Sequence, residues 1–243
     1  MNGYGQYNEP QQSTLYANEN GRYETLSSYT TKTFLWMFAG LLVTFGVAAV
    51  AYAGEWGYYL LSTSRFMFFG LGIAQIAVVM ILVSRLHRMS VGAARAMFFV
   101  YAALTGVVFS TYFWIYDMGT LVLAFGATAL YFGIMAAYGY FTKKDLSGWQ
   151  KPLMFGLIAI LIVSVFGMFF GLGMFDLVLC SVGIIIFACF TAYDTQKIKA
   201  SYFAYAGNEE LAKKASIYSA LQLYLDFINL FLYLLRLFGR SRD

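Results

Sequence analysis

The chain has 243 residues, of which 60% are hydrophobic and 20% aromatic, whereas only 12% are charged. Soluble domains carry about 25% charged residues, so this composition excludes an ordinary soluble protein, a disordered chain and a disulfide scaffold. One histidine and two cysteines supply almost no ligands for a zinc or iron–sulfur site. We therefore expect a multi-pass membrane protein that carries no cofactor and binds no nucleic acid.

Residues 1–31 are rich in Asn, Gln, Ser, Thr, Gly and Tyr and show no periodic apolar stripe. The segment also lacks the basic start and the apolar centre of a signal peptide. We interpret 1–31 as a polar, disordered tail.

Residues 32–243 consist of apolar runs at regular intervals. A transmembrane helix needs about 20 apolar residues. The candidate spans are 33–53, 65–86, 92–115, 119–141, 152–172, 174–195 and 216–238. This pattern predicts an all-α integral membrane domain with seven transmembrane helices. Within the fourth span, Gly126 and Gly133 share a face and are expected to permit close helix packing.

The lysines and arginines set the orientation of the spans. Twelve of the 16 fall on one side if all seven segments cross. These are Arg22, Lys32, Arg85, Arg88, Arg95, Lys143, Lys144, Lys151, Lys197, Lys199, Lys213 and Lys214. We therefore place the N-terminus in the cytoplasm and interpret Arg95 as a topology charge. Three of the four exceptions, Arg236, Arg240 and Arg242, lie at or beyond the end of the last span. Segment 216–238 therefore either crosses against the rule or dips in and returns; crossing is the favoured reading.

The last span carries a row of polar side chains on one helical face. A helix cannot present such a face to lipid, so this span should lie centrally, against other helices or a wet cavity. Hydrogen bonding between helices is one role for the row, but an aspartate in its middle favours a functional one. The row consists of Ser219, Gln222, Asp226, Asn229 and Tyr233.

Asp194 and Asp226 are expected to lie close together, because both should lie in the cytoplasmic half of the membrane. Asp194 lies near the cytoplasmic end of the sixth span, and Asp226 lies about 15 Å into the seventh from the same side. Arg85 ends the second span on that side as well. Two close carboxylates in a low dielectric tend to share a proton, whereas a nearby arginine favours ionisation. The pattern predicts a pH-dependent latch, closed when the two aspartates share a proton and loosened when both ionise. The carboxylate oxygens are also ligands that calcium prefers.

Simpler roles exist for the same residues. Asp194 could be an interfacial carboxylate paired with Lys197. Arg85 and Arg88 could serve only topology, and either could be the latch arginine. His87 is the one histidine and a candidate pH sensor, although an idle interfacial residue is the simpler interpretation.

Several motifs resemble those of the Bax inhibitor family, the transmembrane Bax inhibitor motif proteins, and in particular its bacterial members. The run LYLDFINLF at 223–231, followed by LLR at 234–236, is the most specific. The runs FTAYDTQKI at 190–198 and FTKKDLS at 141–147 match the sixth helix and the loop after the fourth. The likeness covers about residues 30–240, with the motifs in order.

The resemblance implies six helices around a central seventh and a slow, pH-sensitive calcium leak. The gating aspartates of the family map onto Asp194 and Asp226, and its latch arginine maps best onto Arg85. Calcium would be the permeant ion, held by the same two aspartates.

Two functions remain open from the sequence. The first is a calcium leak or ion pathway. The second, suggested by the resemblance, is a regulator that binds a membrane protease or a stress or cell-death partner through its tail. No hydrolase, phosphate-loop or zinc-protease motif occurs, so we expect no enzyme. The lack of a signal peptide, of N-x-Ser/Thr acceptor sites and of a large soluble domain suits a bacterial inner (plasma) membrane, with an intracellular eukaryotic membrane as the alternative.

Overall fold

The computed structural model describes residues 16–17, 23–63, 65–86, 88–170, 176–205 and 207–240. Most of the predicted tail therefore lies outside the described residues, as do His87, Arg242 and residues 171–175.

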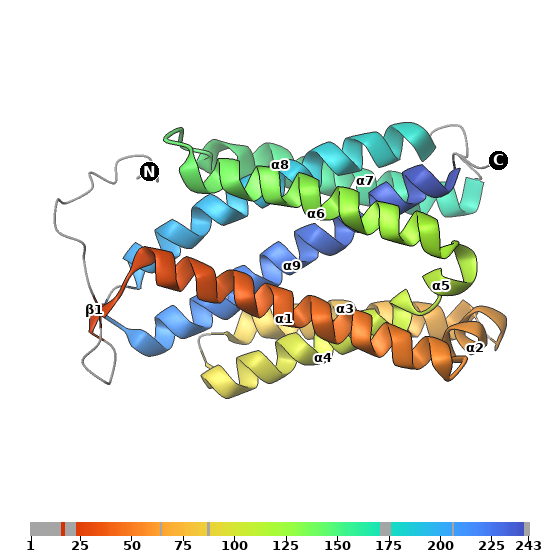
Figure 1. The fold of residues 1–243 in the computed structure, drawn as a ribbon, viewed down its shortest axis with the longest axis horizontal. Helices are drawn as coiled ribbons and strands as arrows, with labels where there is room; N and C mark the ends of the chain where they lie inside the picture. Colours follow the sequence, from red (N-terminus) through yellow and green to blue (C-terminus); the bar gives the residue numbers. More distant parts are fainter. Residues whose placement is uncertain are drawn as a thin grey trace. The chain divides into compact units, whose positions relative to one another are not determined.

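Helices make up nearly all of the described chain, which confirms the all-α prediction (Figure 1). They are α1 (Leu26–Ala53), α2 (Trp56–Thr63), α3 (Arg65–Arg85), α4 (Val91–Phe109), α5 (Tyr112–Ile115), α6 (Met118–Phe141), the 3₁₀ turn η1 (Ser147–Trp149), α7 (Gln150–Phe170), α8 (Asp176–Ala204) and α9 (Glu209–Arg240). Two short strands, β1 (Tyr16–Ala17) and β2 (Tyr23–Glu24), pair antiparallel before α1.

Six helical segments are long and apolar enough to cross a membrane: Leu26–Ala53, Val91–Ile115, Met118–Phe141, Ser147–Gly167, Asp176–Ala204 and Glu209–Gly239. Within α3, Gly70–Arg85 forms a shorter apolar helix, so a seventh crossing stays a prediction. Large apolar side chains are exposed along these helices; Phe141 and Phe155, for example, are 77% and 73% exposed. A bilayer covers such a surface, which confirms the membrane class.

Several helix boundaries differ from the sequence prediction. α1 begins at Leu26 rather than near residue 32, because the Thr25 side chain caps it by accepting from the Ser28 amide at 3.2 Å. α8 continues to Ala204, beyond the predicted end at 195. Hydropathy detects only the apolar part of a helix, whereas polar residues such as Gln and Lys also favour helix.

α9 is one uninterrupted helix of 32 residues, about 48 Å long. A segment that dips into the membrane and returns needs a turn, and α9 contains none. Glu209 and Glu210 in its first turn form ion pairs with Lys213 and Lys214 one turn later, at 2.6 and 2.7 Å. The structure therefore favours the crossing interpretation of segment 216–238.

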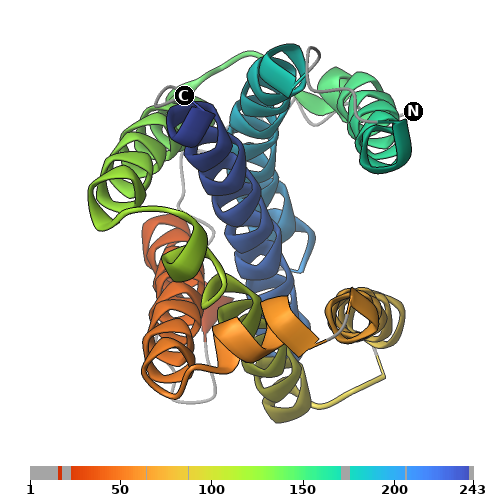
Figure 2. The same ribbon diagram turned by 90° about the vertical axis from the view of Figure 1, so that its right-hand side faces the viewer.

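The helices form two compact units. The N-terminal unit comprises Thr14–Met118 and Ser201–Tyr224, and the described part of the C-terminal unit lies within Gly119–Ala200 and Leu225–Asp243. In the N-terminal unit, α1 and α4 pack side by side (Figure 1). The short α2 contacts α1, α3 and α4 (Figure 2). α9 contributes residues to both units.

Glycines permit close helix contacts, but not at the positions predicted. Within the part of the chain that the structure describes, no neighbouring atom lies within 4 Å of a Cβ built at Gly126 or Gly133, so the prediction of close packing there is wrong. Instead, a Cβ at Gly106 of α4 would lie 2.5 Å from the carbonyl oxygen of Thr44 in α1, and one at Gly139 of α6 would overlap the carbonyl of Ala192 in α8. The sequence gives the glycine positions but not the partner that faces each of them.

Candidate functional site: a buried aspartate pair

The two predicted aspartates lie on different helices of the C-terminal unit. Asp194 belongs to α8 and Asp226 to α9, and they are only 5% and 4% exposed. Buried carboxylates are costly unless they are paired or hydrogen-bonded. Burial of Asp194 disfavours the alternative of an interfacial, solvated carboxylate.

The carboxyl groups of Asp194 and Asp226 lie close enough to interact electrostatically, and to form a hydrogen bond when one of them carries a proton. Within the described residues, Oδ1 of Asp194 and Oδ2 of Asp226 have no hydrogen-bond partner, although both atoms are buried. The neighbouring Thr195 adds a buried hydroxyl oxygen that also lacks one there. Unsatisfied buried oxygens are uncommon in folded proteins, and these can accept a proton, a water molecule or a cation.

Metal binding by this pair would need further ligands. The described residues contain no group of three or more His, Cys, Asp or Glu side chains arranged to hold a metal ion. Calcium takes six to eight oxygen ligands. Two carboxylates would therefore share a calcium ion with hydroxyl, carbonyl or water oxygens, an arrangement better suited to transient passage than to tight storage.

Packing against α6 holds the two aspartate helices in place. Phe227, next to Asp226, packs against Phe125 and Phe132 of α6 with ring-centroid distances of 5.7 and 5.5 Å. On α8, the close approach of Gly139 to Ala192 brings the backbones of α6 and α8 together just before Asp194. The pair thus lies on two helices that share one supporting partner.

The loop after α6 fixes the following turn of α8. The Gln196 side chain accepts a hydrogen bond from the Leu146 amide and donates one to the Lys144 carbonyl, both at 2.8 Å. Beside it lies a cavity of about 10 Å³, lined by Ser147, Tyr193, Gln196, Lys197 and Ala200, which is roughly the space of one water molecule. These contacts therefore anchor the turn of α8 that follows Asp194, on the side that the sequence predicts to face the cytoplasm.

Among the described residues of this unit, Lys197 lies close enough to act electrostatically on both aspartates. Its Nζ also lies 5.9 Å from the centre of the Tyr193 ring. Sequence reasoning considered Lys197 only as a surface partner of Asp194. The sequence did contain a signal for this role, because Lys197 follows Asp194 by about one helical turn and so lies on the same face of the helix.

Arg85, the predicted latch arginine, is the last residue of α3 and has an exposed side chain. Its carbonyl accepts hydrogen bonds from the amides of Arg88 and Met89, at 2.9 and 3.1 Å, where the chain turns toward α4. Arg88 is exposed too. Both arginines belong to the N-terminal unit, and their latch role stays a prediction.

The polar row of α9 has mixed surroundings. Ser219 is buried in the N-terminal unit, whereas Gln222 is half-buried. In the C-terminal unit, the Asn229 amide donates to the Leu225 carbonyl of its own helix at 2.7 Å. Tyr233 stacks on Phe187 of α8 with ring centroids 5.9 Å apart.

Sequence reasoning missed a buried polar contact in the N-terminal unit. Tyr224 is fully buried, and its hydroxyl lies 2.6 Å from the Thr44 hydroxyl of α1. The same Thr44 hydroxyl donates a hydrogen bond to the Ala102 carbonyl of α4 at 2.9 Å. The Tyr224 ring packs edge-on against Phe98 and Tyr101. This contact joins α1, α4 and α9 just before Asp226 in the chain.

Replacing Tyr224 with phenylalanine should lower the melting temperature of the protein in detergent. The substitution removes one buried hydrogen bond, worth about 1 kcal/mol, and leaves the Thr44 hydroxyl with fewer partners. The matched control is Tyr131→Phe, because Tyr131 is 49% exposed on α6. Thermal denaturation followed by circular dichroism checks both variants, and equal melting temperatures for them would contradict the assigned role of the Tyr224 hydroxyl.

Comparison with known proteins decides the family. The family model described as "Inhibitor of apoptosis-promoting Bax1" matches residues 26–243. The chain belongs to the Bax inhibitor-1 family. The resemblance inferred from the motifs is thereby confirmed. The family consists of multi-pass membrane proteins and is not a known enzyme family.

Bacterial relatives match this family member over most of their length. The inner membrane protein YbhL of Escherichia coli K12 is 40% identical over 219 residues, which cover 89% of this chain and 93% of YbhL. An uncharacterised protein of Rickettsia prowazekii is 38% identical over 225 residues, covering 90% and 92% of the two chains. One of Deinococcus radiodurans is 36% identical over 220 residues, covering 90% and 93%.

Proposed function

We propose that the protein is a pH-sensitive calcium leak pathway, gated by the proton that Asp194 and Asp226 share. The observation that carries the proposal is the burial of both carboxyl groups within reach of one another, each with an oxygen that has no partner among the described residues. We also propose an inner-membrane location with the N-terminus in the cytoplasm, in keeping with the positive-inside count and with the inner-membrane name of the relative YbhL.

Gating follows from the charge of the pair. One shared proton leaves a single negative charge and joins α8 to α9 through a short carboxyl–carboxylate contact. Loss of that proton puts two negative charges side by side in a low dielectric, where their repulsion is strong. The repulsion separates the two helices, and the freed oxygens attract a divalent cation. Calcium flux should therefore rise as the pH rises.

The test is calcium flux into liposomes that carry the purified protein, measured from about pH 5 to about pH 8 to vary the proton occupancy of the pair. We expect a pH-dependent flux for the wild type. Asp194→Asn and Asp226→Asn should each remove the pH dependence, because neither leaves two ionisable groups in the pair. The control is Glu55→Gln, which neutralises an exposed carboxylate between α1 and α2.

Two outcomes would overturn the proposal. Folded wild-type protein that gives no flux above empty liposomes at every pH removes the channel function, and a regulator of a membrane protease or stress partner then becomes the leading candidate. A flux with the same pH profile in Asp194→Asn, Asp226→Asn and the wild type would place the gate elsewhere.

A further inference from the structure

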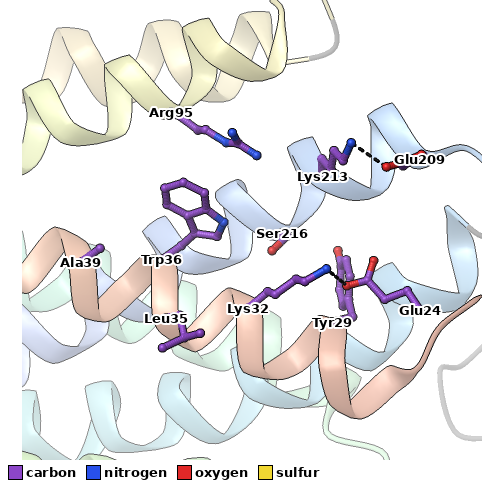
Figure 3. Close-up of a pocket in the computed structure, with 10 residues that line it drawn as sticks. All are labelled: Glu24, Tyr29, Lys32, Leu35, Trp36, Ala39, Arg95, Glu209, Lys213 and Ser216. Atoms are coloured by element: carbon purple, nitrogen blue, oxygen red, sulfur yellow. Dashed lines mark ion pairs between the residues drawn. The ribbon is translucent and has the colours of Figure 1, made fainter. Parts of the chain in front are cut away.

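A separate cavity of about 460 Å³ lies in the N-terminal unit, between α1, α4 and the first turns of α9 (Figure 3). Its volume is in the range of small-molecule sites. The aspartate pair belongs to the other unit and takes no part in it. The cavity has both charged and apolar walls, and each suggests part of a ligand.

The charged wall carries three basic and two acidic side chains. Lys32 forms an ion pair with Glu24 at 2.8 Å, and Lys213 forms one with Glu209 at 2.6 Å. The remaining basic residue is Arg95, for which the described residues supply no carboxylate within ion-pair distance. The wall therefore has one uncompensated positive charge.

The position of Arg95 indicates which chemical group the charged wall would bind. Figure 3 shows Arg95 projecting from α4 toward α9, beside Trp36. Its guanidinium lies 4.7 Å from the centre of the Trp36 ring, and its Nε is buried without a hydrogen-bond partner among the described residues. A stacked guanidinium has its planar donors fixed in direction, which suits a carboxylate or a phosphate. An anion with several oxygens would satisfy the buried Nε.

The apolar wall indicates that this anion belongs to a lipid. Leu35, Trp36 and Ala39 line the cavity from α1, and Leu35 is 60% exposed on a helix that is apolar enough to cross a membrane. Tryptophan is enriched where membrane meets water, at the depth of the head groups. A cavity with a cationic end and an apolar side that continues onto the lipid-facing surface fits an anionic amphiphile.

We propose that this cavity binds the phosphate head group of an anionic membrane lipid. Arg95 is the principal anion-binding residue, Lys32 and Lys213 add positive charge at the rim, and the glycerol and upper acyl chain lie against Leu35 and Trp36. The site assigns Arg95 a binding role in addition to its effect on topology. It is independent of calcium transport, so either proposal can fail while the other stands.

The test is native mass spectrometry of the purified protein in detergent, titrated with phosphatidylglycerol or with phosphatidylcholine of the same chain length. We expect tight binding of phosphatidylglycerol and weaker binding of phosphatidylcholine. Arg95→Gln removes a charge-assisted hydrogen bond and should weaken phosphatidylglycerol binding about tenfold. Ala39→Phe should weaken it as well, by filling the cavity without changing its charge. Arg88→Gln removes an exposed arginine outside the cavity and should bind as the wild type does.

Two outcomes of the titrations would overturn the proposal. One is equal affinity for the two lipids, and the other is unchanged phosphatidylglycerol binding in Arg95→Gln and Ala39→Phe. If Arg95→Gln does not fold, Ala39→Phe alone decides. Soluble glycerol phosphate forms a third arm: if it displaces phosphatidylglycerol at equal concentration, the cavity binds a free phosphate compound and the lipid assignment is wrong.

Discussion

Replacing Gly139 with leucine is expected to destabilise the protein by about 3 kcal/mol or more, because the backbone of α8 leaves no space for a side chain. A Cβ at Gly139 would overlap the Ala192 carbonyl oxygen and lie 2.8 Å from the carbonyl carbon. A backbone group cannot move aside as a flexible side chain can. The contact also lies just before Asp194, so any surviving protein should have an altered aspartate pair.

The matched control for this variant is Gly133→Leu, on the same helix. Gly133 is exposed, and no atom of the described residues outside its own backbone neighbourhood lies within 4 Å of its Cβ position. The control should melt at or slightly above the wild-type temperature, since leucine favours helix over glycine by up to about 1 kcal/mol. Size-exclusion profiles and melting curves in detergent compare the two. Equal losses in both variants would mean that membrane insertion, and not the α6–α8 contact, limits stability.

Asp226→Asn is expected to make the protein more stable than the wild type at high pH, by about 1–3 kcal/mol, because it removes a buried charge that lacks a full set of hydrogen bonds. Asparagine has nearly the same size, and its amide can donate to the Asp194 carboxylate. The gain should shrink as the pH falls, because protons then neutralise the wild-type pair without any substitution. Functional sites are often built from unfavourable interactions, so a substitution that removes one commonly raises stability.

Melting temperatures of Asp226→Asn and the wild type, measured in detergent at several pH values, check this expectation. Glu55→Gln is again the control, since its carboxylate is exposed and its neutralisation should have little effect at any pH. Lower stability of Asp226→Asn at high pH would show that the charge of Asp226 is well compensated, with Lys197 as the first candidate for its partner.

Composition and hydropathy were sufficient to predict the membrane class and the approximate positions of the helices. The exact ends were not predictable in this way, because they depend on polar residues. Thr25 caps α1 ahead of its apolar run, and the positive φ of Gly207, at +88°, marks the turn before α9. Neither residue changes the mean hydropathy of a long apolar window enough to mark the end of a helix.

The spacing of polar residues on one helix was more informative than any single residue. The row through Asp226 and the depth of Asp194 predicted that the two carboxylates lie close together, as the structure places them. Contacts between helices could not be predicted from one sequence. Thr44 lies in an apolar run, where a threonine usually bonds to its own helix, and nothing local indicates that Tyr224 faces it. For the same reason, Arg95 was interpreted only by its charge.

The unequal lengths of the helices have a consequence for the membrane itself. α1, α8 and α9 have 28, 29 and 32 residues, whereas α3 and α7 have 21 each. At 1.5 Å per residue, the shorter ones match a hydrocarbon layer of about 30 Å, whereas the longer ones exceed it and must tilt or protrude. Both aspartates lie on long helices, so a thinner bilayer should change the inclination of the two segments that carry them. Acyl-chain length is therefore expected to affect how the two aspartate helices are arranged.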